Sequence, residues 1–175
     1  EKDNQLWVAT DGGGINIISL DDFSFTNIQQ KQDDVHSFPA NTIYRLYLDS
    51  ANNMWAGSIR RGLIGIRNVF ACSYQNVPFG NLYGLSNQTI NSFFQDSDGM
   101  VWVGTDGGGI NRFDPLTGTF KHYPSTMHEK VVSIVEYTPD ELLFSSFNEG
   151  LFIFHKQTGR VRPFVLVDKE TNDRE

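Results

Sequence analysis

Two loops of this chain carry the residue types that a phosphate-binding site uses. The sequence Asp-Gly-Gly-Gly occurs at 11–14 and again at 106–109. A glycine-rich loop holds phosphate when a helix begins directly after it, because the helix N-terminus supplies free backbone N–H groups. Here the residues after each loop are typical of a strand, so phosphate binding is not favoured. We expect the glycines to permit a tight connection, and Asp11 and Asp106 to accept hydrogen bonds from nearby backbone amides.

No other stretch has the spacing of a metal or catalytic site. Residues 96–99, Asp-Ser-Asp-Gly, begin like a calcium loop, which needs glycine at its sixth position and glutamate at its twelfth. Val101 and Gly107 stand there instead. The four histidines show no ligand spacing to one another, and no Ser/His/Asp set or carboxylate pair can be argued from spacing. We therefore predict no metal, no cofactor and no catalytic residue.

Both glycine-rich loops belong to a longer sequence motif that recurs along the chain. Leu-Trp-Val-Ala-Thr-Asp-Gly-Gly-Gly-Ile-Asn at 6–16 returns almost unchanged at 101–111, and weaker copies lie at 54–64 and 142–152. Trp7, Trp55, Trp102 and Leu143 occupy one position in the four copies, at intervals of 48, 47 and 41 residues. A period of this size indicates a repeat architecture.

The third repeat shows most clearly what one unit contains. Asp98-Gly99 predicts a hairpin turn, and the stretch 114–118, Asp-Pro-Leu-Thr-Gly, predicts a second turn. The β-branched and aromatic residues between the turns predict strands over 89–96, 101–105, 110–113 and 119–123. Four antiparallel strands without a helix signal are the content of one propeller blade.

The repeats divide the chain into about four blades. We place them at about 1–30, 41–77, 88–124 and 129–167, with a polar tail or linker at 168–175. The first repeat begins at its second strand, so its inner strand is absent and the edge beside Val8 is unpaired. The fold class predicted is all-β: a β-propeller segment of about four four-stranded antiparallel blades, part of a seven-bladed propeller. Trp7, Trp55 and Trp102 are expected to be mostly buried where one sheet packs on its neighbour.

Composition limits the partners of the chain. The formal net charge is −7 over 175 residues, which argues against the clustered Lys and Arg of a nucleic-acid site. No window has the length of apolar residues that a membrane span needs, so we expect no membrane contact by this segment. A single cysteine, Cys72, excludes an internal disulfide and is expected to be a small buried hydrophobe.

The repeat resembles that of a known family. Its best copy, 87–123, contains Asn-x-Thr-Ile, Val-Trp-Val-Gly-Thr, a glycine-rich loop and Gly-Ile-Asn-x-Phe-Asp-Pro-x-Thr-Gly-x-Phe. This pattern is similar to the two-component-regulator propeller repeat, and the similarity extends over about 6–164. The second and fourth repeats depart from it, with Ile-Arg-Arg-Gly at 59–62 and Phe-Asn-Glu-Gly at 147–150.

The resemblance implies a fold, a role and a location. Such repeats form the periplasmic sensor of hybrid two-component histidine kinases, abundant in Bacteroides-type bacteria that grow on complex glycans. These sensors typically carry two seven-bladed propellers, a β-sandwich, a membrane helix and cytoplasmic kinase, receiver and DNA-binding parts. This chain would be about half of one propeller, and it shows no kinase, receiver or helix-turn-helix motif.

A ligand site is expected where the loops after the second strands and the links between blades open on the same face. Aromatic rings beside fixed polar groups suit sugar recognition. The links at 30–40, 77–86 and 125–129 add His36, Phe38, Phe79 and Tyr83 to this face. The candidate ligand-binding residues are Asp11, Arg60, Arg61, Asp106, Phe147, Asn148 and Glu149.

Three functions fit these features. The first is a ligand-sensing propeller segment without catalysis, which responds to a glycan and controls transcription of polysaccharide-use genes. The second is a fragment of a propeller lyase or glycosidase, and the third is a scaffold for protein partners. The first is favoured because the inner strands bring a single carboxylate, Glu136, toward the central channel, and an enzyme needs converging acid and base groups. Expected partners are an oligosaccharide and either the remaining blades of the propeller or a second copy of the chain.

Overall fold

The computed structural model of the protein describes residues 2–31, 38–67, 70–74, 77–78 and 80–166. In this part of the chain, fifteen strands form four antiparallel sheets, and the one helical element is a single 3-10 turn, η1 (Pro124–Thr126). The predicted all-β fold, with four sheets of propeller-blade type, is confirmed. The links and tail that include His36, Phe79 and 168–175 lie outside the described residues, as does the side chain of Cys72.

The four sheets follow one another along the chain, and we number them as blades 1 to 4. Within each blade the strands pair in sequence order. Blade 1 consists of β1 (Gln5–Ala9), β2 (Ile15–Ser19) and β3 (Phe25–Ile28). Blade 2 consists of β4 (Ile43–Leu48), β5 (Met54–Ser58), β6 (Leu63–Arg67) and β7 (Phe70–Tyr74). Blade 3 consists of β8 (Ile90–Gln95), β9 (Val101–Thr105), β10 (Ile110–Asp114) and β11 (Thr119–His122). Blade 4 consists of β12 (Val131–Thr138), β13 (Glu141–Ser146), β14 (Gly150–His155) and β15 (Val161–Pro163).

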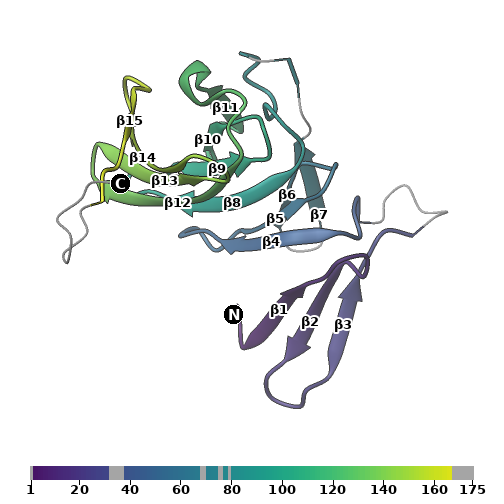
Figure 1. The fold of residues 1–175 in the computed structure, drawn as a ribbon. Coiled ribbons are helices and arrows are strands. Elements are labelled where there is room, and N and C mark those ends of the chain that lie inside the picture. Colours follow the sequence, from purple (N-terminus) through teal and green to yellow (C-terminus); the bar gives the residue numbers. More distant parts are fainter. Residues whose placement is uncertain (1, 32–37, 68–69, 75–76, 79, 167–175) are drawn as a thin grey trace.

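The blades stand side by side around their first strands (Figure 1). β4 contacts β1 of the preceding blade and β8 of the next, and β8 contacts β12. Blade 1 has three strands, as its sequence predicts, so β1 forms its inner edge. This arrangement is that of consecutive propeller blades, in which each sheet is covered by the next.

Hydrophobic clusters fill the spaces between neighbouring blades. Trp55 is buried between blades 2 and 3, where its ring meets Phe113 edge-on with the centroids 4.9 Å apart. Trp102 occupies the same position between blades 3 and 4 and stacks on Tyr123 at 5.7 Å. Trp7 packs between blades 1 and 2 but is only partly buried. Its exposure is greater because β1 has no inner strand beside it to cover the ring.

A carboxylate at the end of the first strand holds each buried tryptophan. The indole Nε1 of Trp55 donates to Asp49 Oδ2 at 2.9 Å, and that of Trp102 donates to Asp96 Oδ2 at 2.7 Å. In both cases the aspartate stands six residues before the tryptophan. Trp7 Nε1 is buried and has no partner among the described residues. In blades 2 and 3 the residue after the first strand therefore supplies the acceptor for the buried indole.

Only glycine fits at the last position of the Asp-Gly-Gly-Gly loops, because a side chain there would clash with neighbouring backbone. Gly14 and Gly109 have φ angles of +72° and +73°, which side chains other than glycine rarely adopt. A Cβ atom added to Gly109 would lie 2.1 Å from the backbone oxygen of Thr126, and one added to Gly14 would lie 2.1 Å from that of Ile28. The loop therefore lies directly against the end of the outer strand in blade 1 and against the link after the outer strand in blade 3.

The expected role of the aspartates in these loops is wrong. Asp11 Oδ1 accepts a hydrogen bond from the Thr42 hydroxyl of blade 2 at 3.2 Å, and Asp106 Oδ1 lies 3.4 Å from Lys130 Nζ at the start of blade 4. Both carboxylates thus reach across to the next blade. The threonine hydroxyl before each loop makes the local bond instead, donating to the carbonyl of the last glycine at 2.8 and 2.9 Å.

Candidate functional site

The first strand of each four-stranded blade has a β-bulge at the same place. In β4 the pairing with β5 shifts between Ile43 and Arg45, and β8 and β12 show the corresponding shift. The extra residues are Tyr44, Asn91 and Val132. A bulge bends its strand and re-aims the extra side chain. Three blades thereby present one re-aimed side chain each at the same end of their first strands.

These three side chains line a cavity of about 640 Å³, within the range of small-molecule sites. The wall is completed by residues that precede the first strands and by residues that follow the second strands. It therefore draws on blades 2, 3 and 4 together. The lining residues are Tyr44, Arg45, Ile59, Arg60, Thr89, Asn91, Asp106, Lys130, Val132 and Phe147.

The cavity has a repeated backbone frame with different side chains. Ile59, Asp106 and Phe147 are equivalent residues, because each directly follows the second strand of its blade. The backbone N–H of each donates to the carbonyl of the residue before the first strand. The N–O distances are 3.4 Å for Ile59 to Thr42, 3.0 Å for Asp106 to Thr89 and 3.0 Å for Phe147 to Lys130. One frame thus offers an aliphatic, an acidic and an aromatic side chain in turn.

Positive charge predominates in the cavity wall. Lys130 Nζ pairs with Asp106 Oδ1 at 3.4 Å, and the side chains are 53 % and 42 % exposed. Arg45 Nε donates to the backbone oxygen of Asn91 at 2.9 Å, so its guanidinium is held by a neutral group. No carboxylate among the described residues forms an ion pair with Arg45 or Arg60. Three cations therefore share a single carboxylate.

Arg60 adopts a backbone conformation that glycine adopts at the equivalent position of two other repeats. Its φ is +65°, and the equivalent residues Gly12 and Gly107 have φ of +86° and +91°. A residue with a side chain in this region carries strain of about 1–3 kcal/mol, and such strain is concentrated at functional sites. A Cβ added to Gly12 or Gly107 meets nothing within 4 Å, so the position projects a side chain into open space.

The structure brings some of the predicted site residues together and separates others. Arg60, Asp106 and Phe147 line the cavity, and Phe147 is 71 % exposed. Asp11 lies in blade 1 and bonds Thr42. The remaining three, Arg61, Asn148 and Glu149, are exposed and are not among the lining residues.

The links between blades contribute less than the sequence suggests. Phe38 is buried in the cluster between blades 1 and 2, and Tyr83 is exposed away from the cavity lining. Sequence reasoning missed most of the wall, which comes from the first strands and their preceding residues. The available signal was divergence between repeats at one position, as at Thr89 and Lys130.

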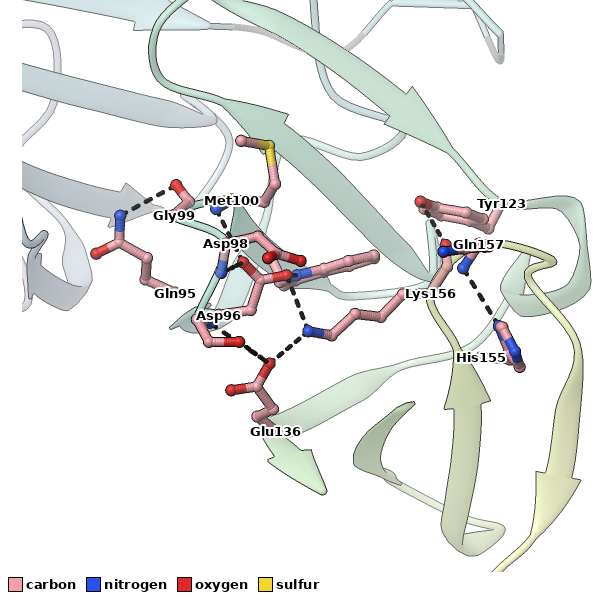
Figure 2. Close-up of polar contacts among 12 residues, drawn as sticks. Gln95, Asp96, Asp98, Gly99, Met100, Tyr123, Glu136, His155, Lys156 and Gln157 are labelled. Atoms are coloured by element: carbon pink, nitrogen blue, oxygen red, sulfur yellow. Dashed lines mark hydrogen bonds and ion pairs between the residues drawn. The ribbon is translucent and has the colours of Figure 1, made fainter. Parts of the chain in front are cut away.

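A second polar cluster lies at the opposite end of the strands, between blades 3 and 4. Lys156, which follows β14, reaches Asp96 after β8 and Glu136 on β12 (Figure 2). Its Nζ is 3.2 Å from Asp96 Oδ2 and also donates to Glu136 Oε1. The Lys156 side chain is 8 % exposed and that of Asp96 is 1 % exposed. This cluster, which we call the Lys156 cluster, borders a cavity of about 340 Å³.

Every charge in the Lys156 cluster is paired. Asp96 also accepts from Trp102 Nε1 and from the backbone amides of Asp98 and Met100, at 3.1 and 2.9 Å. The hydrogen bond from Lys156 lowers the pKa of Glu136. Burial acts to lower the pKa of Lys156, but its bonds to Glu136 and Asp96 outweigh burial and raise that pKa. The cluster is a buried clamp between blades rather than a site with free groups.

The described residues offer neither a metal centre nor a membrane-spanning helix. No group of three or more His, Cys, Asp or Glu side chains there is arranged to hold a metal ion. In the same part of the chain, no helix has the length and apolar character needed to cross a membrane.

Comparison with protein families supports the resemblance seen in the sequence. The model of the two-component regulator propeller family matches residues 37–60 and 84–107. Both matches run from the link before a blade, through its first strand, to the loop after its second strand. They include the bulge and several residues of the cavity wall. No curated protein matches the chain at a significant level.

Solved structures with the same fold include extracellular domains of putative two-component systems and an enzyme. The extracellular domain of a putative hybrid two-component system of B. thetaiotaomicron matches the whole chain with a TM-score of 0.80 and 21 % identity. A second putative hybrid system of that organism matches 99 % of the chain with a TM-score of 0.68 and 21 % identity. The chain spans 28 % and 23 % of these two domains.

Virginiamycin B lyase from Staphylococcus aureus matches 93 % of the chain with a TM-score of 0.69 and 16 % identity, and the chain spans 53 % of the lyase. At these identities the three likenesses establish the propeller fold alone.

Proposed function

We propose that this chain is the ligand-binding propeller segment of an extracytoplasmic two-component sensor, and that it binds an oligosaccharide in the cavity formed by blades 2, 3 and 4. The repeats that match the two-component regulator family and the likeness to extracellular domains of hybrid two-component systems support the sensor role. In this proposal the segment lies in the periplasm. The parent protein is a sensor histidine kinase that controls transcription of polysaccharide-use genes.

The observation that carries the proposal is the construction of the cavity. Its volume of about 640 Å³ suits a short oligosaccharide. Tyr44 and Phe147 are both exposed and offer apolar ring surface, against which the hydrophobic side of a sugar can pack. Asn91, Thr89 and Arg60 add polar groups on fixed backbone positions. Apolar walls with a few fixed polar groups are the usual composition of a small-molecule site.

A sensor fits this cavity better than a glycosidase. Hydrolysis of a glycosidic bond generally uses two carboxyl groups about 5–10 Å apart, one acid and one base or nucleophile. Asp106 is the one carboxylate in the cavity wall, and Lys130 pairs with it. We therefore propose that this segment binds without catalysis.

We further propose that additional blades of the same polypeptide cover the two outer surfaces of this segment. Leu6 on β1 is 43 % exposed, and Val135 and Tyr137 on β12 are 45 % and 50 % exposed. Apolar side chains of a blade are normally covered by the next blade of the ring. Light scattering on the full-length protein tests this: a monomer supports coverage by its own blades. An obligate dimer whose contacts involve β1 or β12 would assign the role to a second copy.

Isothermal titration of the full-length protein with a panel of oligosaccharides tests the binding proposal. The variant Asn91→Trp places a bulky ring at the bulge of β8 and is expected to abolish binding by filling the cavity. Arg61→Ala is the matched control, because Arg61 is exposed next to Arg60 and does not line the cavity. Equal affinity in the Asn91→Trp protein, with an unchanged melting curve, would refute the cavity as the binding site.

A further inference from the structure

The charges of the cavity identify the chemistry of its ligand more closely. Arg45, Arg60 and Lys130 line the cavity together with one carboxylate, Asp106, so these four groups give the wall a formal charge of +2. The chain as a whole carries −7. A local excess of cations on an acidic protein attracts and concentrates anions at that place. We propose, on the basis of the proposed oligosaccharide site, that the ligand is an acidic sugar carrying a carboxylate or a sulfate ester.

The hydrogen-bond partners of these cations leave donors free for an anion. Arg45 donates through Nε to the Asn91 carbonyl and through one terminal nitrogen to its neighbour Tyr44, at 2.9 and 3.4 Å. A guanidinium has five N–H groups, so donors remain beyond these two bonds. Arg60 is exposed and forms no ion pair with any described carboxylate. Guanidinium groups bind carboxylates and other oxyanions through two parallel hydrogen bonds, which suits both candidate anionic groups.

The backbone strain at Arg60 supports an anion-binding role for this side chain. The equivalent positions in blades 1 and 3 are glycines, which reach a positive φ without cost. An arginine there lowers stability and brings no packing, because the position opens into free space at both glycines. What the arginine does add is one cation to the lining of the cavity.

Lys130 and Asp106 control how strongly the cavity discriminates charge. Their ion pair is half exposed, and exposed pairs contribute only about 0–1 kcal/mol. An incoming carboxylate or sulfate can therefore share Lys130 at small cost. Asp106 stays on the wall as the one anion, where it accepts hydrogen bonds from sugar hydroxyls and repels a ligand whose charge is wrongly placed. The site thus binds the anionic group of the sugar at its cations and the neutral hydroxyls at Asp106.

Calorimetric titration with three sugars tests the inference. The probes are trigalacturonate, a sulfated chondroitin disaccharide and neutral galactotriose, each added to the full-length protein. Acidic sugar is expected to bind at least about 10-fold more tightly than galactotriose. The carboxylate and sulfate probes identify which anion is preferred. Affinity for the acidic sugar is expected to fall when salt rises from about 0.01 M to about 0.1 M, because screening shortens from about 30 Å to about 10 Å.

Variants at one position separate the possible outcomes. Arg60→Gly is expected to weaken binding of the acidic sugar about 10- to 100-fold, and Arg60→Lys to weaken it less, since lysine keeps the charge without the paired donors. Arg61→Gly, its exposed neighbour, is the control. If galactotriose binds as tightly as the acidic sugars, or if Arg60→Gly leaves their affinity unchanged, the inference is wrong while the proposed oligosaccharide site stands. If no sugar of any kind binds, both are wrong.

Discussion

The two charged regions at opposite ends of the strands differ in how their charges are paired. The Lys156 cluster has one cation between two carboxylates, all paired, with Asp96 almost completely buried. The cavity has three cations and one carboxylate, all in positions that water reaches. Burying a charge is tolerated when hydrogen bonds and an opposite charge compensate it. Buried, fully paired charges in this fold therefore hold blades together, whereas exposed charges with free hydrogen-bond donors are available to a ligand.

The largest expected effects come from removing what is buried between blades. Trp102→Ala deletes a fully buried indole and should lower the free energy of unfolding by about 3–5 kcal/mol. Trp7→Ala should cost clearly less, because Trp7 is only partly buried. Urea denaturation of both variants measures the difference. Equal losses at the two positions would contradict the view that the missing inner strand leaves blade 1 less tightly packed.

Breaking the Lys156 cluster should be nearly as destabilising. Lys156→Met keeps most of the side-chain volume but leaves the buried carboxylate of Asp96 without its cation, at an expected loss of about 3–5 kcal/mol. Lys121→Met, at an exposed lysine that lines the cavity beside this cluster and lies over the Tyr123 ring, is the control and should cost at most about 1 kcal/mol, the value of an exposed cation–π contact. A small loss in the Lys156→Met protein would show that this cluster resembles the cavity more than we argue.

Acid should weaken the Lys156 cluster. The pKa of Glu136 is lowered below its ordinary value of 4.5, so its contribution is fully present above about pH 4.5 and is lost as the pH falls through the lower folded-state pKa. Glu136→Gln should reduce stability at neutral pH by about 1.5 kcal/mol, the value for a hydrogen bond to a charged group. The loss should shrink toward zero in acid. A loss that stays constant across this pH range would exclude the charge of Glu136 as its cause.

The smallest expected effect is a gain in stability rather than a loss. Arg60→Gly should raise the free energy of unfolding by about 0.5–1 kcal/mol, because relief of a left-handed conformation, about 1–2 kcal/mol, exceeds the entropy that glycine adds to the unfolded chain. Thermal melting in the absence of sugar measures this gain. Together with the loss of binding expected for the same variant, it would mark Arg60 as a residue kept for function. A drop in melting temperature would instead show that Arg60 stabilises the fold.

The sequence was sufficient for the fold because each strand and turn repeats. The recurring tryptophan position, the glycine that closes each loop and the turn residues located the blades and the short first sheet. The cavity was only partly predictable. Arg60 and Phe147 stood out as departures from the repeat, Asp106 as part of its best-preserved loop, and all three line the cavity.

What escaped sequence reasoning depends on geometry that residue types do not encode. Tyr44, Asn91 and Val132 enter the cavity because of a register shift, and simple alternation along a strand does not reveal a bulge. The Lys156 cluster joins residues 96, 136 and 156, which lie in two repeats and have no common spacing. Long-range side-chain pairing of this kind becomes visible only when the blades are placed against one another.

The recurring bulge has a consequence for how such a binding site can be redesigned. The backbone around the cavity is fixed by hydrogen bonds that involve no side chain, so exchanging the side chain at a bulge leaves the frame intact. Tyr44, Asn91 and Val132 occupy equivalent positions on one backbone frame, so their side chains can be exchanged independently. A small library over these positions could therefore retune selectivity by point substitution, much as loop residues are varied on an antibody scaffold, without re-engineering the blades.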